Sequence, residues 1–504
     1  MRLLIDYLHP CLKFFIFFLF FFQTACCSKK KKEEILRIQL SNEPISLDPT
    51  WVEDGVGLQL VHLLHQGLFG YDVQGRLEPH LVDTWSVSSD QKTYQFKLKE
   101  AFWSDGKPVK AEDFVSAFRR MLRVENTSKM ASFFFGIQGA SSFYAGKSSF
   151  LGVSAEGQNL KIRLDRIVPH FLHLLTLPST FPQRQSILDA HEGRWPEKAP
   201  STGQYHLHEH LLKQKIVLAK NTFTQSLWKM LEFQLIFDEN TALNLFESGY
   251  LDILTHVPSL DLKRLQKKLL KAPYFSTYYL AFNCLKPPFQ EVFWRKQVAQ
   301  AIDSKAIVSL LDGSEKPASS FIPFGLVGHT PVSTRVPEKN FLFWKTPLRI
   351  IFDTSVRNSR VMEKVQQDLK SFLKLEVQLT HFDWKTYLAV LKSNRFFEEK
   401  KFDLFRFGWM AAFLDPLSHL KIFVSDDPNN FSGCSSKAYD TCVAQIEKLD
   451  NGPKREALIQ RAQKILIEEE AMVIPIFHYV LTLALSERAE KTRINPFGIF
   501  FFNQ

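Results

Sequence analysis

A short run of histidines carries the residue types for metal chemistry in this 504-residue chain. The segment HLHEH places His206, His208 and His210 at alternate positions, and alternate side chains of a β-strand point to the same face. Three imidazoles on one face would suit zinc, nickel or copper. The alternative, which we favour, is a solvated strand face that holds no metal.

Signatures of catalysis are scarce in the rest of the sequence. It contains no GxSxG, no HExxH and no glycine-rich phosphate loop. Residues 226–229, SLWK, fit the SxxK pattern of penicillin-interactive enzymes, but no KTG follows them. Because no nucleophile stands beside a base in a known pattern, we predict that the protein is not an enzyme and uses no cofactor.

The segment FGWMAAFLDP, residues 407–416, combines residue types that are typical of a binding surface. Gly408 has no Cβ, so another backbone can approach it closely, and Trp409 offers a flat apolar wall. Asp415 directly precedes Pro416, which predicts a helix capped by the aspartate with proline at its first position. Both core packing and the wall of a binding site fit this segment.

The N-terminus has the features of an export signal. Residues 14–22, FFIFFLFFF, are too few to span a bilayer as a helix, which needs about 20 residues, and they suit the apolar core of a secretory signal peptide. The following Cys26 is similar to the lipidated cysteine of a bacterial lipobox, although Gln23 stands where leucine is usual. We predict a lipoprotein signal peptide over residues 1–25, lipidation of Cys26 and a charged tether over residues 26–34. Ordinary secretory cleavage near the same point is the alternative.

Composition indicates an exported globular protein with more than one domain. The chain is longer than a single core, so we expect two or three domains. Its net charge is +10, but the excess is spread along the sequence and no nucleic-acid-binding motif accompanies it, so we expect no nucleic acid partner. Cys434 and Cys442 lie close together in a polar stretch, where they either form a small disulfide loop or stay unpaired.

Hydrophobic periodicity predicts a mixed α/β chain. From residue 348 onward, strands at 348–352, 375–379 and 402–405 alternate with helices at 360–373 and 385–391, the order of a parallel α/β unit. Further predicted elements are strands at 36–40, 92–98 and 472–479 and helices at 57–65, 110–121 and 454–470.

Several segments together resemble the bacterial extracellular solute-binding proteins of family 5, which include the oligopeptide-binding proteins of ABC transporters. They occur in the expected order over nearly all of the mature chain. The segments are NEPISLDP (42–49), the block from GLFGYD to FRRML (67–122), PSTGQYHL (200–207), the block from YYLAFN to KAIV (278–308), FGWMAAFLDP (407–416) and IPIFHY (474–479).

The resemblance implies an α/β fold of the periplasmic binding protein type (class II, cluster C), with two α/β lobes, a ligand cleft between them and an inserted third domain. Domain I would be discontinuous, over residues 35–68, 200–283 and 477–504. Residues 69–199 would form the inserted domain II, and residues 284–476 would form domain III. Hinge strands would let the lobes close over a ligand.

The resemblance also implies which residues meet the ligand. Oligopeptide binders grip the peptide backbone by strand-like pairing, and Gly408, Trp409 and Trp384 fall on the wall where this happens. Glu53 and Arg406 fall where the family places charged residues. These two side chains would pair with each other across the gap between the lobes, or would meet the termini of the ligand.

Ala412 departs from the family pattern. Typical oligopeptide binders carry an aspartate at this position, which binds the α-ammonium of the peptide. A hydrogen bond to a charged group contributes about 1.5–3 kcal/mol, so its loss would lower affinity roughly 10- to 150-fold. Asp415 does not replace this aspartate if it caps a helix. We therefore predict that the amino-terminal anchor is missing.

These features predict a monomeric, lipid-anchored protein of the periplasm, which captures oligopeptides and delivers them to the membrane permease of an ABC importer. Three kinds of cargo are open. The first is a peptide held by its backbone and by another acid such as Glu53. The second is a peptide-like ligand without a free amine, such as a muropeptide, and the third is nickel, haem or a glycan. A surface adhesin with a degenerate cleft is the alternative of another class.

Overall fold

The structure is a computed structural model that describes residues 34–126, 128–224, 226–311, 315–332, 346–393, 399 and 401–502. The predicted signal peptide over residues 1–25, Cys26 and the tether up to residue 33 lie outside the described residues. Within them, no helix combines the length and the apolar character needed to cross a membrane.

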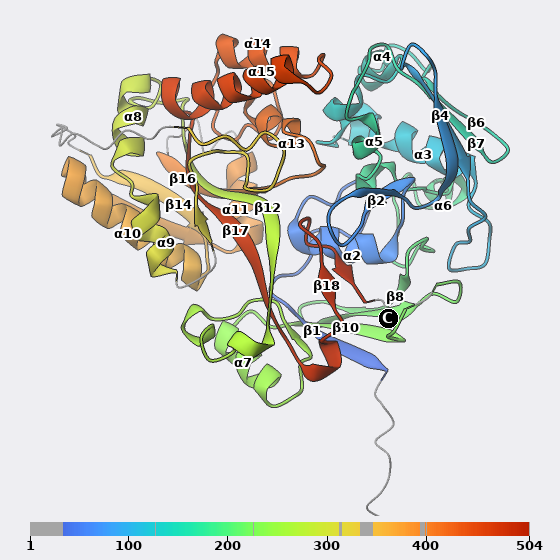
Figure 1. The fold of residues 1–504 in the computed structure, drawn as a ribbon, viewed down its shortest axis with the longest axis horizontal. Coiled ribbons are helices and arrows are strands. Elements are labelled where there is room, and N and C mark those ends of the chain that lie inside the picture. Colours follow the sequence, from blue (N-terminus) through green and yellow to red (C-terminus); the bar gives the residue numbers. More distant parts are fainter. Residues whose placement is uncertain are drawn as a thin grey trace, which may run out of the picture.

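One large sheet of eleven described strands runs through the molecule (Figure 1). In spatial order its strands are β15 (Val377–Phe382), β14 (Leu348–Asp353), β16 (Leu404–Met410), β12 (Leu269–Phe282), β17 (Val473–Leu485), β11 (Ile253–Leu254), β1 (Ile35–Leu40), β10 (Met230–Leu235), β9 (Lys215–Lys220) and β8 (Tyr205–Leu211), and β13 (Lys316–Pro317) pairs with β17. The two ends of the sheet therefore come from different parts of the chain, one from residues before 255 and the other from residues after 346.

Two long antiparallel strands, β12 and β17, belong to both ends of this sheet, and Figure 1 shows them running side by side between the lower and upper parts of the molecule. The first part of β12 pairs with the last part of β17, beside β11, and its second part lies between β17 and β16. The register shifts between Pro273 and Thr277. Such an irregularity bends a strand and increases its twist, and proline fits it because proline has no N–H to donate. The two ends of the sheet are thus joined through a bend.

The predicted parallel α/β unit is confirmed. β14 and β15 pair in parallel around α10 (Val356–Leu373), and α11 (Trp384–Lys392) leads from β15 to β16, which also pairs in parallel with β14. α10 begins where the Ser355 side chain accepts from the Asn358 N–H at 3.0 Å, and it ends at Lys374 in the left-handed conformation.

A second sheet has four antiparallel strands, and α3 (Ala111–Met121) contacts it. Its order is β4 (Val82–Val87), β5 (Thr93–Leu98), β7 (Asn159–Arg163) and β6 (Val153–Glu156). Buried Arg120 of α3 pairs with the Asp48 carboxylate at 2.7 and 2.6 Å. This pair attaches the second sheet and its helix to the loop that precedes α2.

The remaining elements are short strands and helices around these two sheets. The hairpins are β2 (Phe69–Tyr71) with β3 (Leu77–Pro79) and β18 (Arg493–Ile494) with β19 (Phe500–Phe501). The helices are α2 (Gly55–Leu64), α4 (Ala140–Tyr144), α5 (Phe171–Leu174), α6 (Gln185–Ala190), α7 (Glu239–Glu247), α8 (Val292–Gln300), α9 (Ser304–Leu310), α13 (Leu417–Leu420), α14 (Lys437–Ile446) and α15 (Pro453–Lys464), which continues as a π-helical turn over Ile465–Glu469.

A disulfide joins Cys284, which lies just after β12, to Cys434, with a sequence separation of 150 and Cα atoms 5.0 Å apart. The alternative of a bridge between Cys434 and Cys442 is therefore excluded. Cys442 is a buried free thiol on α14, and it donates to the Leu458 carbonyl oxygen at 3.3 Å. Sequence spacing could not identify the pair, because disulfide formation depends on Cα distances that only the fold sets.

We predict that non-reducing proteolysis of the folded protein yields one peptide pair linking Cys284 to Cys434. Cys442 should resist alkylation until the protein is unfolded, because its thiol is buried. Reduction should lower the free energy of unfolding by about 2–5 kcal/mol, since the bridge closes a long loop in the unfolded chain. Peptide mapping by mass spectrometry checks this, and a peptide pair containing Cys442 would contradict it.

Candidate functional site

Strand β16 carries three of the predicted site residues, Arg406, Gly408 and Trp409. It pairs with β12 along its whole length. On its other edge it pairs with β14 only at its first two residues. In the part of the chain that the structure describes, residues 406–410 therefore have no strand partner on that edge, and the last three of them are half-buried.

Arg406 is a buried charge held by groups of the protein. Its Nη1 donates to the Asp353 carboxylate at 2.6 Å, and its Nη2 donates to the Tyr479 hydroxyl. The guanidinium also lies over the ring of Tyr278, 4.4 Å from the ring centre. Burial is the largest effect and opposes the charged form, but the Asp353 carboxylate and the surrounding tyrosines together hold the pKa of Arg406 above its usual range. The guanidinium is therefore charged and paired.

Gly408 lies beside the same tyrosine. A Cβ at this position would come within 3.2 Å of the Tyr479 hydroxyl, so a larger side chain would displace that ring. Tyr479 in turn contacts the Tyr274 ring, with 6.2 Å between ring centres, and Tyr274 reaches Gly55 at the start of α2. Burial raises the pKa of Tyr479, so its hydroxyl is neutral. A row of tyrosines thus connects β16 to the helix of the other lobe.

The two tryptophans are fixed by contacts within the protein. The Trp409 Nε1 donates to the Ser418 carbonyl oxygen at 2.7 Å. Trp384, at the start of α11, stacks on Phe407 with 6.0 Å between ring centres. Both side chains are half-buried, so each combines a structural contact with an accessible surface.

Ala412 begins a segment that contacts residues of 69–199. Its N–H donates to the Ser418 hydroxyl at 2.6 Å, and Phe413 stacks on His170 with 5.5 Å between ring centres. The next N–H, that of Leu414, donates to the Tyr71 hydroxyl at 2.8 Å. The place where the family pattern has an aspartate therefore holds a methyl group within a tightly bound loop.

Asp415 is engaged, as predicted, although its partners differ in part. One carboxylate oxygen accepts from the Leu417 N–H at 2.9 Å, while Pro416 stands at the cap of α13 and outside its first turn. Arg455 donates to both carboxylate oxygens at 2.8 Å, a contact that the sequence did not suggest. The charge of this buried carboxylate is therefore already paired within the protein.

Glu53 joins three parts of the chain. Its carboxylate lies 2.9 Å from the Lys392 Nζ at the end of α11 and 3.6 Å from the Lys129 Nζ. Burial lowers the pKa of Lys129, and the charge of Glu53 opposes this shift. The predicted pairing of Glu53 with Arg406 is not observed, because each has other partners. Neither lysine was found from sequence, since nothing in their flanking residues marks them.

The histidines of HLHEH do not converge. A register shift between Leu207 and Glu209 places His206 and His210 opposite strand positions of different parity on β9, so their side chains point to opposite faces. His206 lies 2.7 Å from the Asn221 side chain, and His210 lies 2.7 Å from Glu43. Among the described residues no group of three or more His, Cys, Asp or Glu side chains is arranged for a metal ion.

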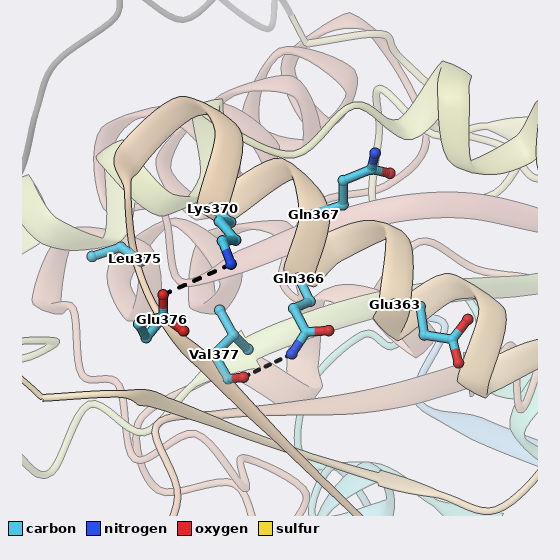
Figure 2. Close-up of a pocket in the computed structure, with 7 residues that line it drawn as sticks. All are labelled: Glu363, Gln366, Gln367, Lys370, Leu375, Glu376 and Val377. Atoms are coloured by element: carbon cyan, nitrogen blue, oxygen red, sulfur yellow. Dashed lines mark hydrogen bonds and ion pairs between the residues drawn. The ribbon is translucent and has the colours of Figure 1, made fainter.

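A surface hollow lies elsewhere, between α10 and the edge strand β15 (Figure 2). Its lining residues are Glu363, Gln366, Gln367, Lys370, Leu375, Glu376 and Val377. The polar groups there are partly satisfied, since Gln366 donates to the Val377 carbonyl oxygen at 2.7 Å and Lys370 lies 3.9 Å from Glu376. β14 separates this hollow from β16, so it does not belong to the site.

Comparison with known proteins decides the family. Residues 76–341 match the model described as bacterial extracellular solute-binding proteins, family 5 Middle. The chain belongs to this family. Two relatives from Escherichia coli (strain K12) match this family 5 protein over most of its length. The probable deoxycholate-binding periplasmic protein YgiS is 27% identical and covers 89% of this chain and 88% of its own. The periplasmic murein peptide-binding protein MppA is 29% identical and covers 88% of each.

Solved structures confirm the predicted fold class and indicate how the parts of the protein are arranged. The murein tripeptide binding protein MppA of Escherichia coli has a TM-score of 0.84 at 26% identity, covering 94% of this chain and 99% of that one. A structure of MppA named as the unliganded open form has a TM-score of 0.65 at 26% identity, covering 93% and 95%. The parts of this family 5 protein are therefore arranged differently from that open form, in agreement with the contacts of Glu53, Phe413 and Leu414.

We predict that Glu53→Gln weakens closure of the lobes. Both Glu53 and Lys392 are partly exposed, so the pair contributes at most about 1 kcal/mol, which is roughly a fivefold change in the balance of open and closed forms. Small-angle X-ray scattering of the unliganded variant should give a larger radius of gyration than the parent protein.

The matched control is Glu363→Gln, on the exposed face of α10 in the hollow described above. This change removes the same charge without touching the contact between lobes. Identical scattering from the two variants would contradict the role of Glu53.

Proposed function

We propose that this family 5 protein is the substrate-binding component of an ABC importer, capturing an oligopeptide or peptide-like ligand between its lobes. The observation that carries the proposal is the edge of β16 over residues 407–410, which has no strand partner among the described residues on the side away from β12, while the Arg406 carbonyl oxygen is already bound by the Tyr387 hydroxyl. An extended peptide can add to such an edge as a further strand, and main-chain hydrogen bonds of this kind do not depend on peptide sequence. The murein peptide named for MppA supports cargo of this class.

We assign the lobes from the arrangement of the two sheets. Residues 35–68, 200–283 and 477–504 form domain I, residues 69–199 form domain II and residues 284–476 form domain III. This division is supported by the second sheet, which lies within domain II, and by the opposite ends of the large sheet. β12 and β17, which both ends share, serve as the hinge. Rotation at their irregular register would open the edge of β16 to the ligand.

The remaining parts of the proposal concern the membrane. Cys26 is lipidated and anchors the protein in the periplasm, and the closed lobes dock on the permease subunits of the transporter as a monomer. The periplasmic location named for YgiS and MppA supports this location. Neither a metal nor another cofactor is part of this function, and no reaction is catalysed.

A second candidate cargo is a non-peptide molecule. YgiS, whose name gives deoxycholate as its probable ligand, is as similar to this chain as a peptide-binding relative is. An amphipathic molecule would use the half-buried faces of Trp384 and Trp409 and would leave the edge of β16 unpaired. Backbone pairing therefore separates the two candidates.

The test of the function compares one peptide that binds with an analogue methylated on its backbone nitrogens. Methylation removes the N–H donors that strand pairing needs and leaves the side chains unchanged. We expect an affinity loss of at least about fivefold for each donor removed, since a net hydrogen bond contributes about 1 kcal/mol. Equal affinity in isothermal titration calorimetry would favour the non-peptide candidate.

Ala412→Asp should restore an anchor for a peptide amine. We expect the variant to favour a free peptide over its N-acetylated form by roughly 10- to 150-fold, because the new carboxylate would bind a charged donor. The parent protein should show no such preference. The control is Ala438→Asp on the exposed side of α14, which adds the same charge on a helix that carries none of the predicted site residues. A parent protein that loses binding on acetylation would show that another acid already holds the amine.

A further inference from the structure

The charged residues of the proposed site are paired within the protein. Arg406 is the cation nearest to the open edge of β16, and Asp353 at the end of β14 lies 2.6 Å from it. A positive and a negative charge at this separation form a dipole, whose attraction for a distant carboxylate is much weaker than that of a lone cation. A ligand carboxylate that approached Arg406 would also meet the charge of Asp353.

The free donor of Arg406 suits a neutral acceptor. Among the described residues its buried Nε has no hydrogen-bond partner, while the Tyr278 side chain beneath the guanidinium interacts with Arg406 itself. A buried donor without a partner is costly, and a carbonyl or amide oxygen satisfies it without adding a second negative charge beside Asp353. The same arrangement penalises a carboxylate.

The neighbouring arginine is paired in the same way. Arg357, in the first turn of α10, lies 3.5 Å from the Glu315 carboxylate. Its charge also acts on Tyr479, which places it near the same tyrosine. This further cation is thus also paired with an acid.

The acids that could bind an amine are engaged too. Ala412 provides no carboxylate, Asp415 is held by Arg455, and Glu53 is held by two lysines from the other parts of the chain. In the closed arrangement Lys392 contacts the Glu53 carboxylate. A ligand ammonium that bound Glu53 would have to displace this lysine.

From these pairings we infer that this chain selects cargo that is uncharged at the ends which meet the site, with a blocked or absent amine and an amide or ester in place of a free carboxylate. Asp353 is the positioning residue for this selectivity, because it acts through Arg406. The inference rests on the proposed function and narrows its ligand class.

The experiment uses four libraries of random tetrapeptides: free, N-acetylated, C-amidated, and blocked at both ends. The full mature protein is incubated with an equimolar mixture of the four, and retained ligands are counted by native mass spectrometry. We expect the doubly blocked form to be retained at least as well as the free form. Preference for the free form by more than about tenfold, the effect of one charged hydrogen bond, would overturn the inference.

Asp353→Asn tests the role of the paired acid. This change keeps the volume of the side chain and an acceptor oxygen, but it removes the negative charge that compensates the charge of Arg406. We expect retention to shift toward the forms with a free carboxylate by about tenfold or more relative to the amidated forms. Asp426→Asn, an exposed residue of the same region, is the control and should leave the ratio unchanged.

The outcomes separate the two claims. If the protein retains none of the four libraries, peptide capture itself fails and the inference fails with it. If it retains mainly the free form, capture stands and the inference is wrong. An unchanged ratio in folded Asp353→Asn would show that Asp353 does not set selectivity. If that variant does not fold, the ratios measured on the parent protein still decide the inference.

Discussion

The structure depends on two strands that are shared between its lobes. β12 and β17 pair with each other along almost their whole length. At one end of the sheet β17 also pairs with β11, and at the other end β12 also pairs with β16. Their pairing is interrupted at residues 274–276 and resumes at Thr277, so the same two strands connect both ends of the sheet across the bend. The same strands place Tyr274, Tyr278 and Tyr479 beneath the open edge of β16. The two strands proposed as the hinge therefore also form the floor of the proposed site.

Two charge pairs with different surroundings occur at the proposed site. In the closed arrangement the Glu53 carboxylate is shared by lysines of two other parts of the chain, and Arg406 is satisfied by Asp353. The first contact is partly exposed and weak, which keeps closure reversible, as delivery to a permease requires. The second is buried, and breaking it would leave an uncompensated charge. Closure can be tuned without disturbing selectivity, since different pairs serve the two purposes.

Local patterns predicted the helices and strands well, because these elements depend on residues that are close together in the sequence. The apolar residues of the strand at 348–352 and the helical spacing of residues 360–373 fix each element within a few residues, although α10 begins earlier, at Val356 after the Ser355 cap. β16 runs on to Met410, past its predicted end at residue 405, because β12 pairs with it there. The register shift in β8 also escaped prediction, and it turned a plausible metal face into two separate contacts.

For the proposed site, the sequence predicted residues but not their pairings. Arg406, Gly408 and Trp409 were predicted because they stand in one recognisable segment. Their partners Asp353, Tyr479 and Ser418 come from other segments, and only the folded chain brings them together. The same holds for the disulfide, whose two cysteines are separated by 150 positions. Pairings between distant residues carry no signal in a single sequence.

The most direct test of the account is native mass spectrometry of the mature protein purified with the ligand that it acquires in its own cell. The account predicts one bound small molecule per monomer, which fragments as a peptide-like compound without a free ammonium and carboxylate pair at its ends. A protein that carries nothing after gentle purification, or one that carries a free zwitterionic peptide, would contradict it.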